Sequence, residues 1–117
     1  MKYPSLIAIV VLIFCSPLSA NAKDGSQLVN EWRASSRCEG GNASLCTIKE
    51  KLDSFLYIGY VDGASEAMDS KHYAPPLHAK VGQILHVVGK WLDDHPSQWH
   101  KPAAELVAQA LKEAFPK

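Results

Sequence analysis

The sequence predicts a small all-α protein, a four-helix bundle with up to five helices, which follows a cleaved signal peptide. Apolar residues recur at helical spacing in four stretches of the chain. Pro-rich and Gly-rich connections separate these stretches. No part of the sequence shows the pattern of a strand. Each stretch has one apolar and one charged face, which is the pattern of helices packed in a bundle.

Residues 1–22 are expected to form a secretory signal peptide. Lys2 gives a positive start, residues 6–14 are uninterruptedly apolar, and small residues allow cleavage after Ala22. The apolar run is too short for a transmembrane anchor, which needs about 20 residues. We therefore expect one domain over residues 23–117, located in the periplasm.

The charge balance excludes some classes of partner. The full chain holds 12 basic and 12 acidic residues, and loss of Lys2 with the signal peptide leaves a net charge of about −1. Such a balance favours neither nucleic acid nor an anionic membrane surface, so we expect no nucleic acid and no membrane as partners.

Two helices are expected in the N-terminal half of the domain. The first begins at Asp24 or Ser26, either of which can cap it, and stops before Gly40. The second runs from about residue 44 to residue 69, and its glycines favour a kink. Its apolar stripe at helical spacing consists of Leu45, Ile48, Leu52, Phe55, Leu56, Gly59, Gly63 and Ala67.

Two further helices are expected in the C-terminal half. Pro76 suits the first position of the third helix, and His95-Pro96 ends it, because the residue before a proline is pushed out of the helical region. Pro102 opens the fourth helix and Pro116 stops it. The short turn between them, residues 97–101, makes these two helices neighbours.

Cys38 and Cys46 are expected to form a disulfide. Removal of the signal peptide removes Cys15 and leaves an even pair in an oxidising compartment. The intervening segment is flexible, and closure of so short a loop stabilises the fold by about 2–3 kcal/mol. Free thiols or a metal pair are the alternatives, but no second Cys-x-x-Cys or His-rich motif accompanies the two residues.

The motifs that carry enzyme chemistry are missing from the sequence. It has no Gly-x-Ser-x-Gly, no Gly-rich phosphate loop and no dinucleotide fingerprint. The five histidines do not follow the spacing of metal ligands. We therefore expect neither an enzyme nor a bound cofactor or metal.

Two groups of residues are candidates for contact with a protein partner. His72 and Tyr73 stand on an exposed connection, where an aromatic side chain either anchors an interface or packs on the bundle. Asp93, Asp94 and His95 end the third helix, where acidic residues oppose the helix dipole. This second group forms either a contact patch or a solvated turn.

Gly59 and Gly63 lie four residues apart, and Ala67 continues this row of small residues. Another helix can approach closely where side chains are small. Close helix packing inside the monomer is the simpler interpretation, and the seam of a homodimer is the alternative.

Several segments of the C-terminal half together resemble a known family. They are Gly59-Tyr60-Val61-Asp62-Gly63, Gly82-Gln83-Ile84-Leu85, Trp91-Leu92-Asp93-Asp94-His95-Pro96, Trp99-His100-Lys101-Pro102-Ala103 and Ala114-Phe115-Pro116. This set is similar to the Rap/Tai family of type VI secretion immunity proteins, over most of residues 53–116. Many members have cysteines at the positions of Ala74 and Lys117, so the bridge pattern of this chain departs from the family's.

The resemblance implies a helical periplasmic protein that binds and blocks a toxin delivered by neighbouring cells. The toxin is typically a peptidoglycan amidase, and members of the family tend to dimerise and to obstruct its active site with an exposed loop. The connection at residues 70–76 is our candidate for that loop. A small periplasmic stress chaperone of the HdeA-like type is the alternative function, and it should unfold at low pH.

Overall fold

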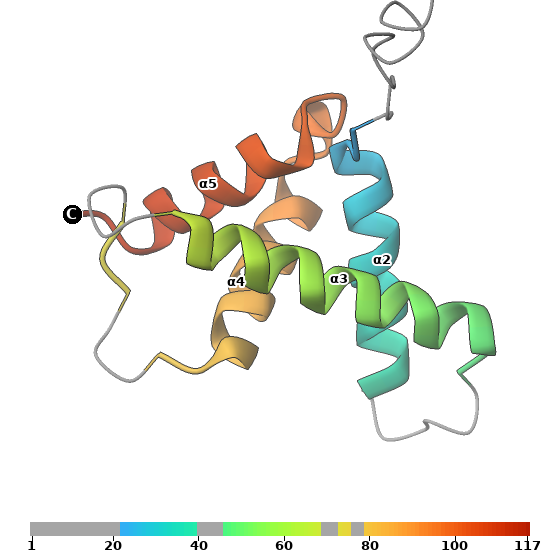
Figure 1. Cartoon of the computed structure of the whole chain (residues 1–117). Coiled ribbons are helices and arrows are strands. Elements are labelled where there is room, and N and C mark those ends of the chain that lie inside the picture. The colour runs from blue at the N-terminus through green and yellow to red at the C-terminus, as the bar shows by residue number, and fades with distance from the viewer. Residues whose placement is uncertain (1–21, 40–45, 69–72, 76–78) are drawn as a thin grey trace, which may run out of the picture.

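The computed structural model describes residues 22–39, 46–68, 73–75 and 79–117 (Figure 1). Within these ranges no strand is formed, which confirms the predicted all-α class. The predicted signal peptide lies outside the described residues, except for Ala22. The helical elements are α2 (Gly25–Glu39), α3 (Ile48–Ala67), α4 (Val81–Asp94), the 3₁₀ turn η2 (Pro96–Gln98) and α5 (Ala103–Ala114).

Side-chain caps determine where α2 and α3 begin. Asp24 accepts a hydrogen bond from the Gln27 backbone N–H at 2.9 Å, and the Gln27 side chain accepts one from the Asp24 N–H at 3.2 Å. This reciprocal pair is a capping box. Thr47 caps α3 by accepting a bond from the Glu50 N–H at 3.1 Å. The helix therefore begins at Ile48 rather than near residue 44, and it is continuous where a kink was predicted.

The start of α4 differs from the prediction, whereas its end agrees. Lys80 has an extended backbone (φ −84°, ψ 151°), so the helix begins at Val81 and not at Pro76. It ends at Asp94, directly before His95-Pro96, as predicted. α5 follows after η2 and packs beside α4, as the short turn predicted.

Trp32 of α2 joins three helices. Its ring lies so close to Gly89 of α4 that a β-carbon on this glycine would come within 2.2 Å of the ring. The indole N–H donates to the Asp93 carboxylate at 2.9 Å. The ring centroid lies 5.5 Å from that of Tyr57 on α3. One side chain thus fixes how α2, α3 and α4 meet.

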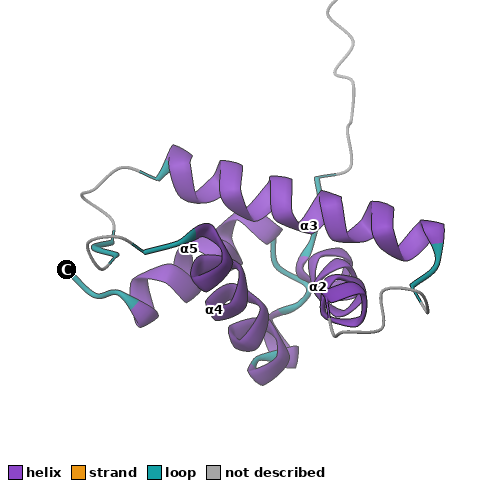
Figure 2. Cartoon of the chain, turned by 90° about the horizontal axis from the view of Figure 1, so that it is seen from below, coloured by secondary structure: helices purple, strands orange, loops and turns teal. Residues whose placement is uncertain are grey.

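The hydrophobic core fills the space between the inner side of α3 and the other helices. α3 lies across one side of the bundle in two perpendicular views (Figures 1 and 2). The core residues include Leu28, Val29, Trp32, Tyr57, Val61, Leu85, Val88, Leu92, Leu106, Val107 and Leu111.

Backbone hydrogen bonds tie the start of α2 to the α4–α5 connection. The Gly25 N–H donates to the Lys101 carbonyl and the Ser26 N–H donates to the Trp99 carbonyl, each at 3.0 Å. Gly25 makes this approach possible, because a β-carbon would lie 2.5 Å from Leu106 and 2.7 Å from the Trp99 backbone.

Lys23 adds a side-chain anchor at the same end of the molecule. Its carbonyl accepts a bond from the Ala103 N–H at 2.9 Å. Its ammonium group pairs with the buried Glu31 at 2.6 Å and lies 4.8 Å from the centre of the Tyr60 ring. A buried carboxylate needs such a partner, so Lys23 and Glu31 stabilise each other's place in the fold.

The contact between Trp32 and Gly89 is testable with matched glycine substitutions. Gly89→Ala should lower the free energy of unfolding by about 1–3 kcal/mol, because the added methyl group overpacks the core. Gly82→Ala on the same helix is the control, since its β-carbon would meet nothing within 4 Å. Urea denaturation of both variants measures the difference, and equal stabilities would contradict the described packing.

The buried Tyr57 predicts a loss of stability in alkali. Burial, with a smaller contribution from the charge of Asp93, raises the pKa of Tyr57 well above its usual value of 10.0. Its hydroxyl donates to the Leu85 carbonyl. The neutral side chain stabilises the fold fully below about pH 10, and this stabilisation is lost as the pH rises further, since only the unfolded tyrosine ionises readily.

Tyr57→Phe should therefore cost about 1 kcal/mol at neutral pH, where the hydrogen bond is lost. The same variant should lose less stability than the wild type as the pH is raised above about 10. Denaturation midpoints measured from neutral to alkaline pH test this difference. Parallel pH profiles for the two proteins would show that Tyr57 does not contribute.

Candidate interaction surface

α3 exposes large apolar side chains to solvent. The exposed fractions are 78% for Ile48, 58% for Leu52, 70% for Phe55 and 54% for Leu56. These positions follow the spacing i, i+4, i+7 and i+8, so they share one side of the helix. The opposite side, which faces the core, carries Ser54, Tyr57, Val61 and Ser65. The stripe found in the sequence therefore lies on the outside of the bundle.

Gly59 and Gly63 continue the same side of α3 toward its C-terminal end. A β-carbon built on either glycine would meet no atom within 4 Å. The prediction that these glycines serve close helix packing within the monomer is therefore wrong, because no described helix approaches them. Ala67 is exposed as well.

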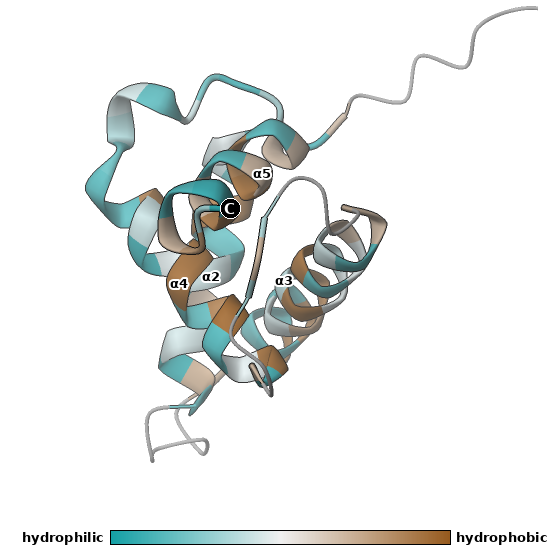
Figure 3. Ribbon diagram, turned by 90° about the vertical axis from the view of Figure 1, so that its left-hand side faces the viewer, coloured by the Kyte–Doolittle hydropathy of each residue, from teal (hydrophilic) through white to brown (hydrophobic). Residues whose placement is uncertain are grey.

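The outer side of α3 thus forms one continuous surface. We name it the α3 face, and Figure 3 shows α3 at one side of the molecule with hydrophobic positions along it. Its residues are Ile48, Leu52, Phe55, Leu56, Gly59, Gly63 and Ala67.

A small apolar hollow of about 250 Å³ borders the α3 face. Phe55 belongs to both, and Ile58 and the two cysteines also line the hollow. The face therefore continues into a depression beside the end of α2.

A second hollow, of about 450 Å³, is polar and lies between α2 and α3. Both of its lysines are paired: Lys23 with Glu31 at 2.6 Å and Lys49 with Asp53 at 2.7 Å. The hydrogen bond from Lys49 to Asp53 raises the pKa of this lysine. Because these charges neutralise each other, the hollow does not concentrate charge of one sign for a ligand.

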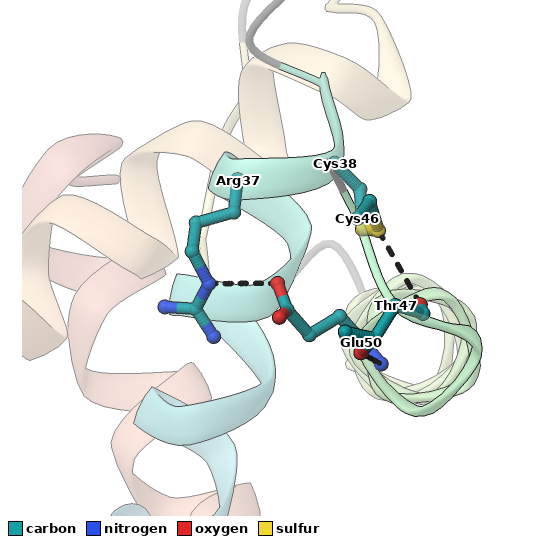
Figure 4. The surroundings of a disulfide bond; sticks show 5 residues. All are labelled: Arg37, Cys38, Cys46, Thr47 and Glu50. Carbon is teal, nitrogen blue, oxygen red and sulfur yellow. Dashed lines mark hydrogen bonds and ion pairs between the residues drawn. A yellow bond between two sulfur atoms is a disulfide. The ribbon is translucent and has the colours of Figure 1, made fainter. Parts of the chain in front are cut away.

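Cys38 and Cys46 lie at disulfide distance, with their Cα atoms 5.2 Å apart, which is within the usual range. Figure 4 shows the bridge at the end of α2, beside an ion pair between Arg37 and Glu50 at 2.8 Å. The Glu50 carboxylate and the two sulfurs lie within 4.8 Å of one another. Metal ligation requires thiolates, so the bonded pair does not offer this group of atoms as a metal site.

Tyr73, a predicted contact residue, belongs to the core. It is 7% exposed, its hydroxyl donates to the Ser65 carbonyl at 3.1 Å, and its ring centroid lies 6.4 Å from that of Phe115. The structure thus favours packing on the bundle over an exposed interface anchor. His72 lies outside the described residues.

The residues of the predicted patch at the end of α4 differ in whether they bond to other residues of the bundle. Asp93 accepts the bond from the Trp32 indole and pairs with Arg33 at 3.6 Å. The His95 ring stacks on Trp91 with centroids 4.1 Å apart, and its Nδ1 lies 2.7 Å from the Trp91 carbonyl oxygen. Asp94 is exposed. Asp93 and Asp94 are both exposed, but the carboxylate of Asp93 is engaged by Trp32 and Arg33, whereas the structure gives Asp94 no such bond to the core; His95 is half-buried.

The different environments of the neighbouring aspartates make a direct test. Asp93→Ala should lower the free energy of unfolding by about 1–3 kcal/mol, because it leaves the Trp32 indole N–H without its acceptor. Asp94→Ala should change it by less than about 0.5 kcal/mol. Urea denaturation followed by tryptophan fluorescence measures both. An equal effect of the two substitutions would contradict the assignment.

The helices of the described part of the chain are too short or too polar to cross a bilayer. Comparison with curated proteins and with solved structures gives no match. A family model described as Rap1a immunity proteins matches residues 14–116, which includes every described helix. This match confirms the resemblance found in the sequence, and the chain belongs to the family of Rap1a immunity proteins.

Proposed function

We propose that the protein is a periplasmic immunity protein, which binds and inhibits a peptidoglycan amidase toxin delivered by type VI secretion. The family match over residues 14–116 is the observation that carries this proposal. Such a protein acts by occupying the toxin, and it has no reaction of its own to catalyse. A cell-wall hydrolase acts in the periplasm, so its inhibitor has to reach the same compartment.

The start of the folded domain supports export. We propose that residues 1–22 are removed after Ala22, so that Lys23 becomes the first residue. Lys23 is already part of the bundle through its bonds to Ala103 and Glu31. The residue directly after the proposed cleavage site therefore already contacts the helices of the domain.

The polar groups of the domain suit a binding protein better than an enzyme. Asp93 accepts a hydrogen bond from the Trp32 indole and forms an ion pair with Arg33, and Glu31 forms an ion pair with Lys23. Among the residues that the structure describes, Tyr57 has the strongest shift in pKa, which is explained by its burial in the core. These groups are engaged in packing the helices, and their arrangement gives no reason to assign a reaction.

We propose two candidate contact sites for the toxin, the connection at residues 70–76 and, as a separate second patch, the end of α4. Asp94 is exposed there, and stacking on Trp91 holds the His95 ring in place. A side chain that is already fixed loses little conformational freedom on binding. His72 remains a candidate on the connection, whereas Tyr73 is left out because it packs in the core and Asp93 because its carboxylate is bonded to Trp32 and Arg33.

The proposal is tested by expressing the protein together with the periplasm-directed toxin encoded beside it. The wild type should protect the cells and copurify with the toxin. The double substitution Asp94→Lys with His95→Ala should weaken the complex at least tenfold and reduce protection. Glu39→Lys, a charge reversal at another exposed acid, is the control and should still protect.

Two outcomes would count against this function. Failure of the wild type to bind and protect would reject an immunity role toward that toxin. An unfolding transition at about pH 3 that exposes apolar surface, with suppression of aggregation, would favour the stress chaperone instead. A circular-dichroism titration with a light-scattering assay separates these cases.

A further inference from the structure

We infer that the folded domain protects its own signal-peptide cleavage site, so that removal of residues 1–22 has to precede closure of the bundle around Lys23. This inference rests on the proposed cleavage after Ala22, and it adds an order to two events that the proposed function leaves unordered. Hydrolysis adds water to the amide bond between Ala22 and Lys23. The C–N bond breaks, Ala22 keeps the carboxylate, and the amine of Lys23 takes up a proton.

The backbone directly after this bond is paired with the connection between α4 and α5. The Lys23 carbonyl accepts a hydrogen bond from the Ala103 N–H at 2.9 Å. Asp24 and Pro102, the next residues on the two segments, form an antiparallel bridge. A protease takes up the residues around the bond that it cuts as an extended segment, so backbone that is buried or already hydrogen-bonded resists cleavage.

The Lys23 side chain is held as well. Its ammonium group lies 2.7 and 2.6 Å from the two carboxylate oxygens of Glu31, and 4.8 Å from the centre of the Tyr60 ring. The side chains of Lys23 and Glu31 are only 21% and 11% exposed. A protease that binds Lys23 has to break this pair, which leaves the Glu31 carboxylate buried without its partner, and that state is costly.

The two residues after Lys23 are also fixed. Asp24 caps α2 through its reciprocal bonds with Gln27. Gly25 is buried, and its N–H donates to the α4–α5 connection at 3.0 Å. Ala22, before the bond, is exposed. The bond to be cut therefore lies where an exposed residue meets a docked segment, and a protease reaches it only when residues 23–25 leave the bundle.

The order of events follows from where the partners of this segment lie in the chain. The docked state does not require earlier cleavage, because the structure is that of the uncleaved chain, residues 1–117. The partners at residues 101–103 come close to the C-terminal end of the sequence. Before they fold, the bond is open to a protease. Afterwards cleavage depends on the small fraction of molecules in which the segment has opened, so docking and cleavage compete.

An order-of-addition experiment tests this with the full-length precursor and purified signal peptidase in a mild detergent. Precursor diluted from urea together with the peptidase should be cut after Ala22. Precursor that refolds before the peptidase is added should be cut at least about tenfold more slowly, because cleavage then waits for opening. Mass spectrometry identifies Lys23 as the new first residue, and tryptophan fluorescence confirms that the precursor has refolded.

An insertion after Ala22 separates protection by the docked segment from a general effect of folding. The insert begins with a second Lys-Asp pair, which preserves the residues next to the bond, and continues as a flexible Gly-Ser spacer. The refolded insertion variant should be cut as fast as the freshly diluted one, because its cleavage site no longer belongs to the docked segment.

Glu31→Gln tests the contribution of the ion pair. Loss of the pair should speed cleavage of the refolded precursor severalfold, because the segment then opens more readily. Glu39→Gln, which neutralises an exposed acid at the other end of α2, is the matched control and should be cut as slowly as the wild type. The same rate for both variants would contradict the role assigned to Lys23 and Glu31.

Two results would overturn the inference and leave the proposed function intact. One is an equal cleavage rate for refolded and freshly diluted wild-type precursor. The other is continued protection of the refolded insertion variant, because protection would then arise elsewhere in the fold. Freshly diluted precursor that is not cut after Ala22 would instead reject the proposed cleavage site and the inference with it.

Discussion

The contact of Trp32 with Gly89 is the constraint on which the rest of the arrangement depends. It lets the Trp32 ring of α2 lie directly on the backbone of α4, and the indole bond to Asp93 fixes the rotation of the ring. Tyr57 then packs against the same ring and donates to the Leu85 carbonyl, which determines which side of α3 points inward. Because Tyr57 and Val61 occupy the core, Leu52 and its apolar neighbours have to face solvent.

The described surface of the domain thereby presents two regions of different chemistry on different elements. The first half of the α3 face is apolar, with Ile48, Leu52, Phe55 and Leu56 exposed, whereas the exposed Glu66 shares the side of the helix that carries Gly59 and Gly63. The end of α4 presents Asp94 and a His95 ring held by Trp91. An apolar face and a polar patch favour different kinds of contact, because the first gains from removal from water and the second from complementary charge and hydrogen bonds.

Features with local causes could be predicted from the sequence, and features with tertiary causes could not. The cap at Asp24 and the end of α4 before Pro96 follow from residues within one turn. The periodicity of the sequence reveals the apolar stripe of α3 but not whether the stripe faces the core or the solvent. The side that faces the core is the one on which Tyr57 donates to the Leu85 carbonyl and Ser65 donates to the Asp62 carbonyl. Tyr73 was ambiguous for the same reason, since only its packing against Phe115 shows that it is buried.

The bonds from Gly25 and Ser26 to the α4–α5 connection join parts of the chain that are far apart in sequence. Contacts of long sequence separation form late, because the intervening chain must first be ordered. The first helix thus acquires its final neighbours only after the residues beyond Trp99 have been synthesised. Until then the start of α2 lacks the two backbone bonds that join it to the α4–α5 connection.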